Sequence, residues 1–566
     1  MRKPFHLKIL LLSVLLLLSF GTSYSQVELV SPSHPVYDYL KRMQLEGMIP
    51  AYNSANIPIS RGEVAGYLKI IGENSGKLSG IDKQFLSDYK VEFEYDMTGL
   101  TKNQSSLFSR TGFSNIFNDR KQKYLYNYVD SNVTFFLDGI GSLSQRGSDG
   151  DSIGINSILL GEIGFRMRGT LFNSVGYYLR LSNGQKLNGD SKDVKFAAYT
   201  DPKLKANTKF THEEKNFDTF EGYLRYQTER NWLALTVGRE AIYNGFGYID
   251  RLFLSNNTVP FDFIKLDIAY KALKYTFIYG SIKGDSLGRD LDWKNVVTHR
   301  LDINFSRHFK LGLSEAIITS NSPFDFTFLN PVSFLTSADL NTGASQTMES
   351  NALTGIDFEI NPAKNVAFQG SLLIDDLTFE TLFKDDSTAN ENKFAYQLGA
   401  LWTNAFTVPN ITLALEYTRL DPFVYSHRSN KNTYTNWGMS LGHALPPNSD
   451  EIAAKLKVDI TSRLRFDFLY QKQRSANGFL YDSLGNVIKN YGGDINRGDH
   501  DQPRYGKNEF LEGNKVDRDI FTFNIVYEPI RQYFLCIKYQ YRISDLLYLS
   551  KKIKDSYYWI TLRIDY

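Results

Sequence analysis

One short stretch of the chain concentrates charged and aromatic residues around two glycines, Gly245 and Gly247. The residues that we select as candidate ligand contacts are Arg239, Glu240, Tyr243, Phe246, Tyr248 and Arg251. An arginine can bind a carboxylate or a phosphate through two parallel hydrogen bonds, and aromatic rings can stack on sugar rings. The stretch therefore predicts a site for an acidic sugar or lipopolysaccharide. Two alternatives remain open: the charges form an internal network that fixes a plug-like loop, and the rings pack that loop.

Catalytic and metal-binding spacings are missing from the sequence. None of the HExxH, G-x-S-x-G or P-loop patterns occurs. His427 follows Ser426 directly, but adjacent residues of a strand point to opposite faces, so they are not expected to form a catalytic dyad. The run of residues 149–151 lacks the remaining ligands of a calcium loop. We therefore predict no enzyme activity, no catalytic residue, no metal site and no cofactor.

Composition narrows the class of protein. The 566 residues include 64 Lys and Arg against 62 Asp and Glu, a net charge of +2, which is too small to recruit nucleic acid by charge alone. Aromatic residues make up 14% of the chain, which excludes wholesale disorder. The single cysteine, Cys536, cannot form an intramolecular disulfide. A hydrophobic content of 42% is too low for a bundle of membrane helices but suits a membrane β-barrel, where alternate residues face lipid.

The N-terminus has the features of an export signal. Arg2, Lys3 and Lys8 precede an apolar run over residues 9–20, and small residues follow at Ser23 and Ser25. The run is shorter than the roughly 20 residues that a membrane-spanning helix needs. Residues 1–25 are therefore predicted to be a cleaved signal peptide, with an N-terminal anchor as the alternative.

Residues 26–95 carry a helical period and are predicted to form a small periplasmic helical domain. Apolar residues recur at helical spacing from Val36 to Met43, and Gly47 follows as a stop signal. A second helix is expected to begin at Ser60, because Glu63 completes a capping box. This unit resembles half of a surface-layer-homology-type module, which would contact cell-wall or surface polysaccharide. We prefer the interpretation that it is a cap packing on the rest of the protein.

Residues 96–566 change to a period of two, which is typical of β-strands. At the C-terminus one face carries Tyr558, Ile560, Leu562, Ile564 and Tyr566, and the other carries Trp559, Thr561, Arg563 and Asp565. Strands of about nine to twelve residues, joined alternately by short turns and long connections, are typical of outer-membrane barrels. A barrel in lipid must close, because an open edge would leave backbone amides unpaired. The pattern predicts an antiparallel, all-β transmembrane barrel of about 18 strands in the cell outer membrane.

A series of short motifs follows the candidate ligand contacts along the chain. They include Gly238-Arg239-Glu240, Gly245-Phe246-Gly247-Tyr248, Pro260-Phe261-Asp262, Leu329-Asn330-Pro331 and Leu441-Gly442-His443. Their order and spacing resemble the capsule-assembly outer-membrane proteins of the Wzi type, over most of the mature chain. The resemblance implies an 18-stranded barrel that binds capsular or exopolysaccharide and helps to assemble or retain it at the cell surface. Residues 481–518 do not fit the resemblance.

A porin or solute-specific channel is the alternative function. The glycine-containing stretch and bulky inward side chains favour a filled lumen over an open one. The expected partners are surface polysaccharide, outer-membrane lipid and lipopolysaccharide, with the capsule export machinery as a further partner and no nucleic acid.

Overall fold

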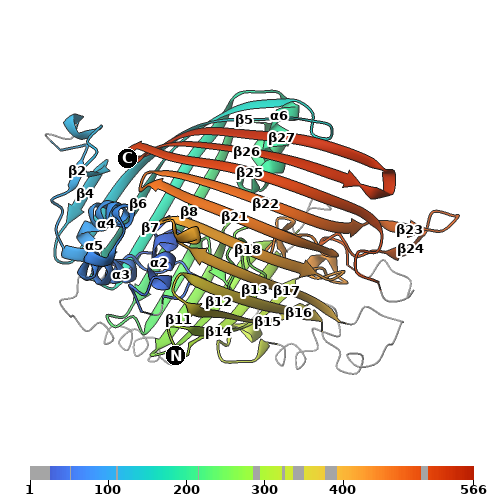
Figure 1. The fold of residues 1–566 in the computed structure, drawn as a ribbon, viewed down its shortest axis with the longest axis horizontal. Helices are drawn as coiled ribbons and strands as arrows, with labels where there is room; N and C mark the ends of the chain where they lie inside the picture. The colour runs from blue at the N-terminus through green and yellow to red at the C-terminus, as the bar shows by residue number, and fades with distance from the viewer. Residues whose placement is uncertain are drawn as a thin grey trace, which may run out of the picture.

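The computed structural model describes residues 26–50, 52–109, 113–214, 216–284, 293–320, 326–335, 350–376, 392–498 and 508–566. The predicted signal peptide, residues 1–25, lies outside the described residues. Within the described ranges, 18 long strands form one closed antiparallel barrel (Figure 1). The predicted fold class is therefore confirmed.

The barrel strands follow one another in chain order around the ring. They are β5 (Thr134–Gly150), β6 (Asn156–Leu171), β7 (Val175–Asn188), β8 (Asn216–Gln227), β9 (Leu233–Glu240), β11 (Phe261–Tyr270), β12 (Leu273–Lys283), β13 (Trp293–Asn304), β14 (Phe309–Ser320), β15 (Ser350–Ala363), β16 (Val366–Asp376), β17 (Lys393–Thr403), β18 (Ile411–Leu420), β21 (Ser449–Thr461), β22 (Leu464–Asn477), β25 (Asn514–Ile530), β26 (Tyr533–Leu546) and β27 (Lys551–Asp565). β27 closes the ring by pairing with β5, and the short strand β4 (Tyr126–Val129) extends the edge of β5. Several strands run beyond the predicted twelve residues, up to 17 in β5 and β25.

The two faces of the strands lie as the alternation predicted. On β27, Leu562 is 54% exposed on the outside of the barrel. Its neighbour Arg563 points inward, where its side chain lies 3.4 Å from Asp565. Apolar side chains thus form the surface that lipid covers, because only they tolerate contact with hydrocarbon.

The connections divide the barrel into two ends. One end, the short-turn end, carries residues 172–174, 228–232, 271–272, 305–308, 364–365, 404–410, 462–463 and 531–532. The other, the long-connection end, includes residues 189–215, 241–260, 421–448 and 478–513. Two links at that end, 151–155 and 547–550, are shorter than predicted. The turn between β25 and β26 consists of Arg531 and Gln532, because β25 continues its pairing to Ile530.

A unit of four helices precedes the barrel: α2 (Val36–Leu45), α3 (Arg61–Glu73), α4 (Gly80–Glu92) and α5 (Glu94–Thr98). The capping box of Ser60 and Glu63 is present at the start of α3, as predicted. Helices α4 and α5 were not predicted. Three further short helices, α6 (Ser191–Thr200), α7 (Pro202–Lys205) and α8 (Thr208–Glu213), lie in the connection between β7 and β8. Across the described part of the chain, every helix is too short or too polar to cross a membrane.

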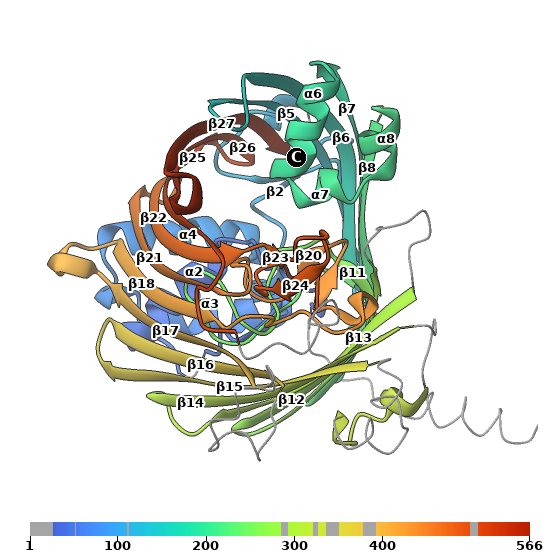
Figure 2. The same cartoon turned by 90° about the vertical axis from the view of Figure 1, so that its right-hand side faces the viewer.

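The helical unit docks inside the short-turn end of the barrel (Figures 1 and 2). Arg42 of α2 donates to Asp459 of β21 at 3.0 Å, and the Lys41 ammonium lies 2.5 Å from Glu359 of β15. Both barrel carboxylates point into the lumen and are almost fully buried. These contacts support the interpretation of the unit as a cap, while its periplasmic location stays a prediction.

Candidate functional site

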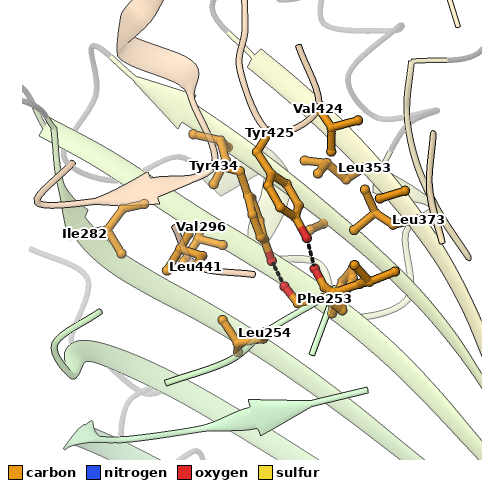
Figure 3. Packing of buried hydrophobic residues seen from close by; sticks show 14 of the residues in the cluster. Phe253, Leu254, Ile282, Val296, Leu353, Leu373, Val424, Tyr425, Tyr434 and Leu441 are labelled. Atoms are coloured by element: carbon orange, nitrogen blue, oxygen red, sulfur yellow. Dashed lines mark hydrogen bonds between the residues drawn. The ribbon is translucent and has the colours of Figure 1, made fainter. Parts of the chain in front are cut away.

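Two connections fold back into the lumen at the long-connection end. Residues 241–260 and 421–448, which we name the plug segments, pack their apolar side chains together with inward residues of the surrounding strands. Tyr425 and Tyr434 stack with their ring centroids 5.5 Å apart. Their hydroxyls donate to the carbonyl oxygens of Leu252 at 2.5 Å and Phe253 at 2.7 Å (Figure 3). The tyrosines thus fasten one plug segment to the other.

A cavity of about 250 Å³, the inner cavity, lies between the plug and the helical unit. Tyr52, Tyr243, Tyr248, Arg251 and Lys41 contribute to its lining. Arg251 lies 4.4 Å over the ring of Tyr243 and donates to the Gly245 carbonyl at 2.8 Å. Burial lowers the pKa of the Arg251 guanidinium and of the Lys41 ammonium. The cavity therefore offers cations and aromatic rings, the groups that bind acidic sugars.

Tyr248 joins the plug to two barrel carboxylates. Its hydroxyl donates to Glu359 at 3.2 Å, and its backbone N–H donates to Glu416 at 2.9 Å. Burial, followed by the negative charge of Glu359, raises the pKa of the Tyr248 hydroxyl. The hydroxyl thus keeps its proton as a hydrogen-bond donor.

A second cavity of about 420 Å³, the outer cleft, opens at the rim of the barrel. It exists because β9 ends at Glu240, while β8 continues six residues further to Asn216 without a partner on that side. Arg239 forms a bidentate pair with Asp262, with hydrogen bonds of 3.0 and 2.6 Å. Its guanidinium also lies 5.7 Å from the ring of Phe220.

Aromatic side chains also line the outer cleft. Trp293 of β13 and Trp437 of a plug segment line it, and Lys283 lies 4.6 Å over the ring of Trp293. Trp293 is about half exposed. An arginine and indole rings in one cavity suit the carboxylate and the flat face of an acidic sugar.

The structure separates the six predicted site residues into different surroundings. Arg239 faces the outer cleft, whereas Glu240 points inward and is buried, because successive residues of a strand face opposite ways. Tyr243, Tyr248 and Arg251 come together in the inner cavity. Phe246 is buried within the plug.

Phe220, Trp293 and Trp437 were missed at the sequence level. They come from three segments that are far apart in the chain, and the pairing of neighbouring strands from β8 to β13 together with the folding of a plug segment brings them to one cavity. Trp293 begins β13 and Trp437 directly follows β19 (Thr435–Asn436), whereas Phe220 lies within β8 and gives no such signal.

Ser426 and His427 have structural roles in a plug segment. The Ser426 hydroxyl donates to the Phe423 carbonyl at 2.6 Å, and His427 Nδ1 accepts from the Ser429 N–H at 3.1 Å. Within the described ranges, no group of three or more His, Cys, Asp or Glu residues could hold a metal ion.

A closed barrel with an apolar exterior and segments folded into its lumen defines a β-barrel of the outer-membrane type. Residues 180–498 match the family of the capsule assembly protein Wzi. Since this match spans more than half of the chain, the protein belongs to the Wzi capsule assembly family. The predicted family is thus confirmed.

Two solved structures are similar to the chain, and the first of them supports the barrel fold. The Wzi structure from Escherichia coli, described as a carbohydrate-binding β-barrel involved in group 1 capsule assembly, is 13% identical with a TM-score of 0.54. That match covers 95% of this chain and 99% of the other. OprD of Pseudomonas aeruginosa is 9% identical, with a TM-score of 0.43, over 76% of this chain and 95% of its own. No curated protein sequence matches the chain.

Proposed function

We propose that this protein binds capsular polysaccharide at its long-connection end and retains the polymer at the cell surface. Membership of the Wzi family supports this function, and so does the carbohydrate binding described for the Escherichia coli protein of the same fold. The observation that carries the proposal for this chain is the outer cleft, which Arg239, Trp293 and Trp437 line together.

Arg239 is available to a ligand because its present partner is weakly held. The side chains of Arg239 and Asp262 are 35% and 57% exposed. An exposed ion pair contributes only about 0–1 kcal/mol, so a sugar carboxylate can replace Asp262 at small cost. The indole rings then cover the apolar face of the sugar.

The remaining predicted residues support the cleft from inside the barrel. Glu240 ends β9 directly below it, and Tyr243, Tyr248 and Arg251 fix the plug segment through the contacts described above. That all six bind polymer directly stays a prediction. Contacts with lipopolysaccharide and with the capsule export machinery are part of the same proposal.

Retention is favoured over conduction because both ends of the lumen contain folded protein. The helical unit lies in the short-turn end and the plug segments lie in the other. A channel would instead need a continuous water-filled path. Single-channel recording in a planar bilayer separates the two functions, and we expect no steady conductance.

The decisive experiment combines a deletion with two matched arginine variants. Deleting the gene should release polysaccharide into the medium while its total amount stays unchanged. Purified Arg239→Ala protein should bind the released polysaccharide about tenfold more weakly, the equivalent of about 1.4 kcal/mol. Arg474→Ala is the control, because Arg474 is a half-exposed arginine outside the cleft that also pairs with an aspartate, Asp450.

Two results would contradict the proposal. Unchanged surface polysaccharide in the deletion strain would remove the retention function. Equal binding by both arginine variants, with normal heat-modifiable migration, would remove the outer cleft as the binding site.

A further inference from the structure

Part of the connection between β14 and β15 lies on the outside of the barrel wall (Figure 2). This stretch, residues 326–335, begins with η3 (Phe326–Leu329), and we name it the wall segment. Its residues Phe328 and Leu335 pack against outward side chains of β12, β13 and β14, among them Phe277 and Ile317. The outward face of these strands is the face that lipid covers. The wall segment therefore lies at the depth of the membrane.

Two polar contacts hold the wall segment in place. The Leu335 N–H donates to Glu315 at 2.9 Å, and the Tyr275 hydroxyl donates to the Pro331 carbonyl. Glu315 lies opposite His299 in the pairing of β13 with β14, and both are more than 90% buried. Polar groups on the lipid-facing wall are costly, and the wall segment shields this pair from the hydrocarbon.

A cavity of about 750 Å³, the wall cavity, remains between the wall segment and the barrel. Ile268, Leu313 and Ile356 line it from the strands, and Val332 and Phe334 line it from the wall segment. It is larger than the inner cavity or the outer cleft and falls in the size range of ligand pockets, about 300–1,000 Å³. Its apolar lining and its place on the lipid-facing wall suit a hydrocarbon chain.

One polar atom in the lining is left without a partner. His299 lies between the rings of Tyr275 and Phe277, with centroid distances of 5.9 and 5.3 Å. Its Nε2 is buried and makes no hydrogen bond to any residue that the structure describes. A buried polar atom of this kind needs a hydrogen-bond partner that the described residues do not supply.

Charges at the short-turn end match a phosphate headgroup. Three successive turns of this part of the wall, at 271–272, 305–308 and 364–365, carry the exposed cations Lys271, Arg307 and Lys364. Exposed Tyr270 and Phe305 lie beside the first two of these turns, as aromatic residues do at a membrane interface. Attraction to a phosphate would favour lipid from the leaflet at the short-turn end.

We propose that the wall cavity binds one acyl chain of an anionic phospholipid whose phosphate lies near Lys271, Arg307 and Lys364. The wall segment covers the chain. Lipopolysaccharide is the competing occupant, but its headgroup would lie at the opposite, long-connection end.

Native mass spectrometry of the full-length protein with dioleoylphosphatidylglycerol in detergent micelles tests this site. The wild-type protein should retain one lipid. Ile356→Trp and Leu313→Trp fill the cavity from two different strands and should each retain the lipid about tenfold more weakly. Ile560→Trp is the matched control, because Ile560 is a similarly exposed isoleucine on β27, away from the wall segment. Heat-modifiable migration shows which variants have assembled.

A second measurement uses the unaltered protein and so does not depend on any variant folding. A phosphatidylglycerol with a photoreactive acyl chain should label residues 326–335 in preference to the outer face of β27. Equal lipid retention by the cavity-filling variants and the Ile560→Trp control would overturn the proposal. Labelling of the wall segment by lipopolysaccharide alone would overturn it as well.

Discussion

Glu359→Gln should loosen the helical unit from the barrel without unfolding the barrel itself. The Glu359 carboxylate has no exposed surface, and it accepts from Lys41 of α2 at 2.5 Å and from Lys310 of β14 at 3.0 Å. The Tyr248 hydroxyl of a plug segment also donates to it at 3.2 Å. One carboxylate therefore connects the helical unit, the barrel strands and a plug segment.

The size of the effect follows from what the substitution leaves behind. Glutamine keeps the shape and one acceptor oxygen, but two buried ammonium groups lose their only shared counter-charge. Removing one partner of a buried ion pair costs about 3–5 kcal/mol. The population with an undocked helical unit should therefore rise by about two to four orders of magnitude.

Hydrogen exchange followed by mass spectrometry measures this population. Amides of α2 should exchange at least about a hundredfold faster in Glu359→Gln, while amides of β25 and β26 keep their protection. Asp262→Asn is the matched control, since it removes a carboxylate from an exposed pair and should change protection by no more than about 1 kcal/mol. Unchanged exchange of α2 in Glu359→Gln would refute the reasoning that this buried carboxylate holds the cap in place.

Three further predictions concern the membrane, the plug and the compartment. Leu562→Arg should reduce the yield of assembled barrel far more than Arg563→Leu, because an arginine on the lipid face costs up to about 2–4 kcal/mol near mid-membrane; equal yields, measured by heat-modifiable migration, would show that the faces are assigned wrongly. Arg251→Ala should lower the thermal stability of the plug, because Arg251 is bonded to the Gly245 carbonyl; weaker polymer binding at unchanged stability would place Arg251 in the ligand site. On cell fractionation the protein should appear with the outer membrane, and recovery as a soluble periplasmic species would contradict the barrel assignment.

Periodicity predicted the barrel because it depends on each strand alone. On the outer face of β27, the apolar residues must face lipid whatever the neighbouring strands are, and the alternation already predicts this. These residues are Tyr558, Ile560, Leu562 and Ile564. The capping box at Ser60 was equally local, since its partner lies only three residues away. Helices α4 and α5 were not predicted, because their hydrophobic faces become clear only from the helices on which they pack.

The candidate site was predicted only in part, because it depends on residues that are far apart in the chain. A glycine-containing stretch between two arginines marks residues 239–251 in the sequence, and the structure does place Tyr243, Tyr248 and Arg251 around one cavity. The sequence did not show that Arg239 and Glu240 lie on opposite sides of the wall, which depends on β9 ending where it does.

The sequence by itself determined the class of the protein. Three features indicated it: the alternation along each strand, the signal-like N-terminus and the series of short motifs. Each of them can be recognised from residues that are near one another in the chain. The tertiary structure alone decided where ligands can bind. The outer cleft joins β8, β9 and β13 to a plug segment, and the wall cavity joins six strands to a segment folded back outside them. Such cavities arise where segments fold back onto paired strands of unequal length, and this property is not written in any single stretch of residues.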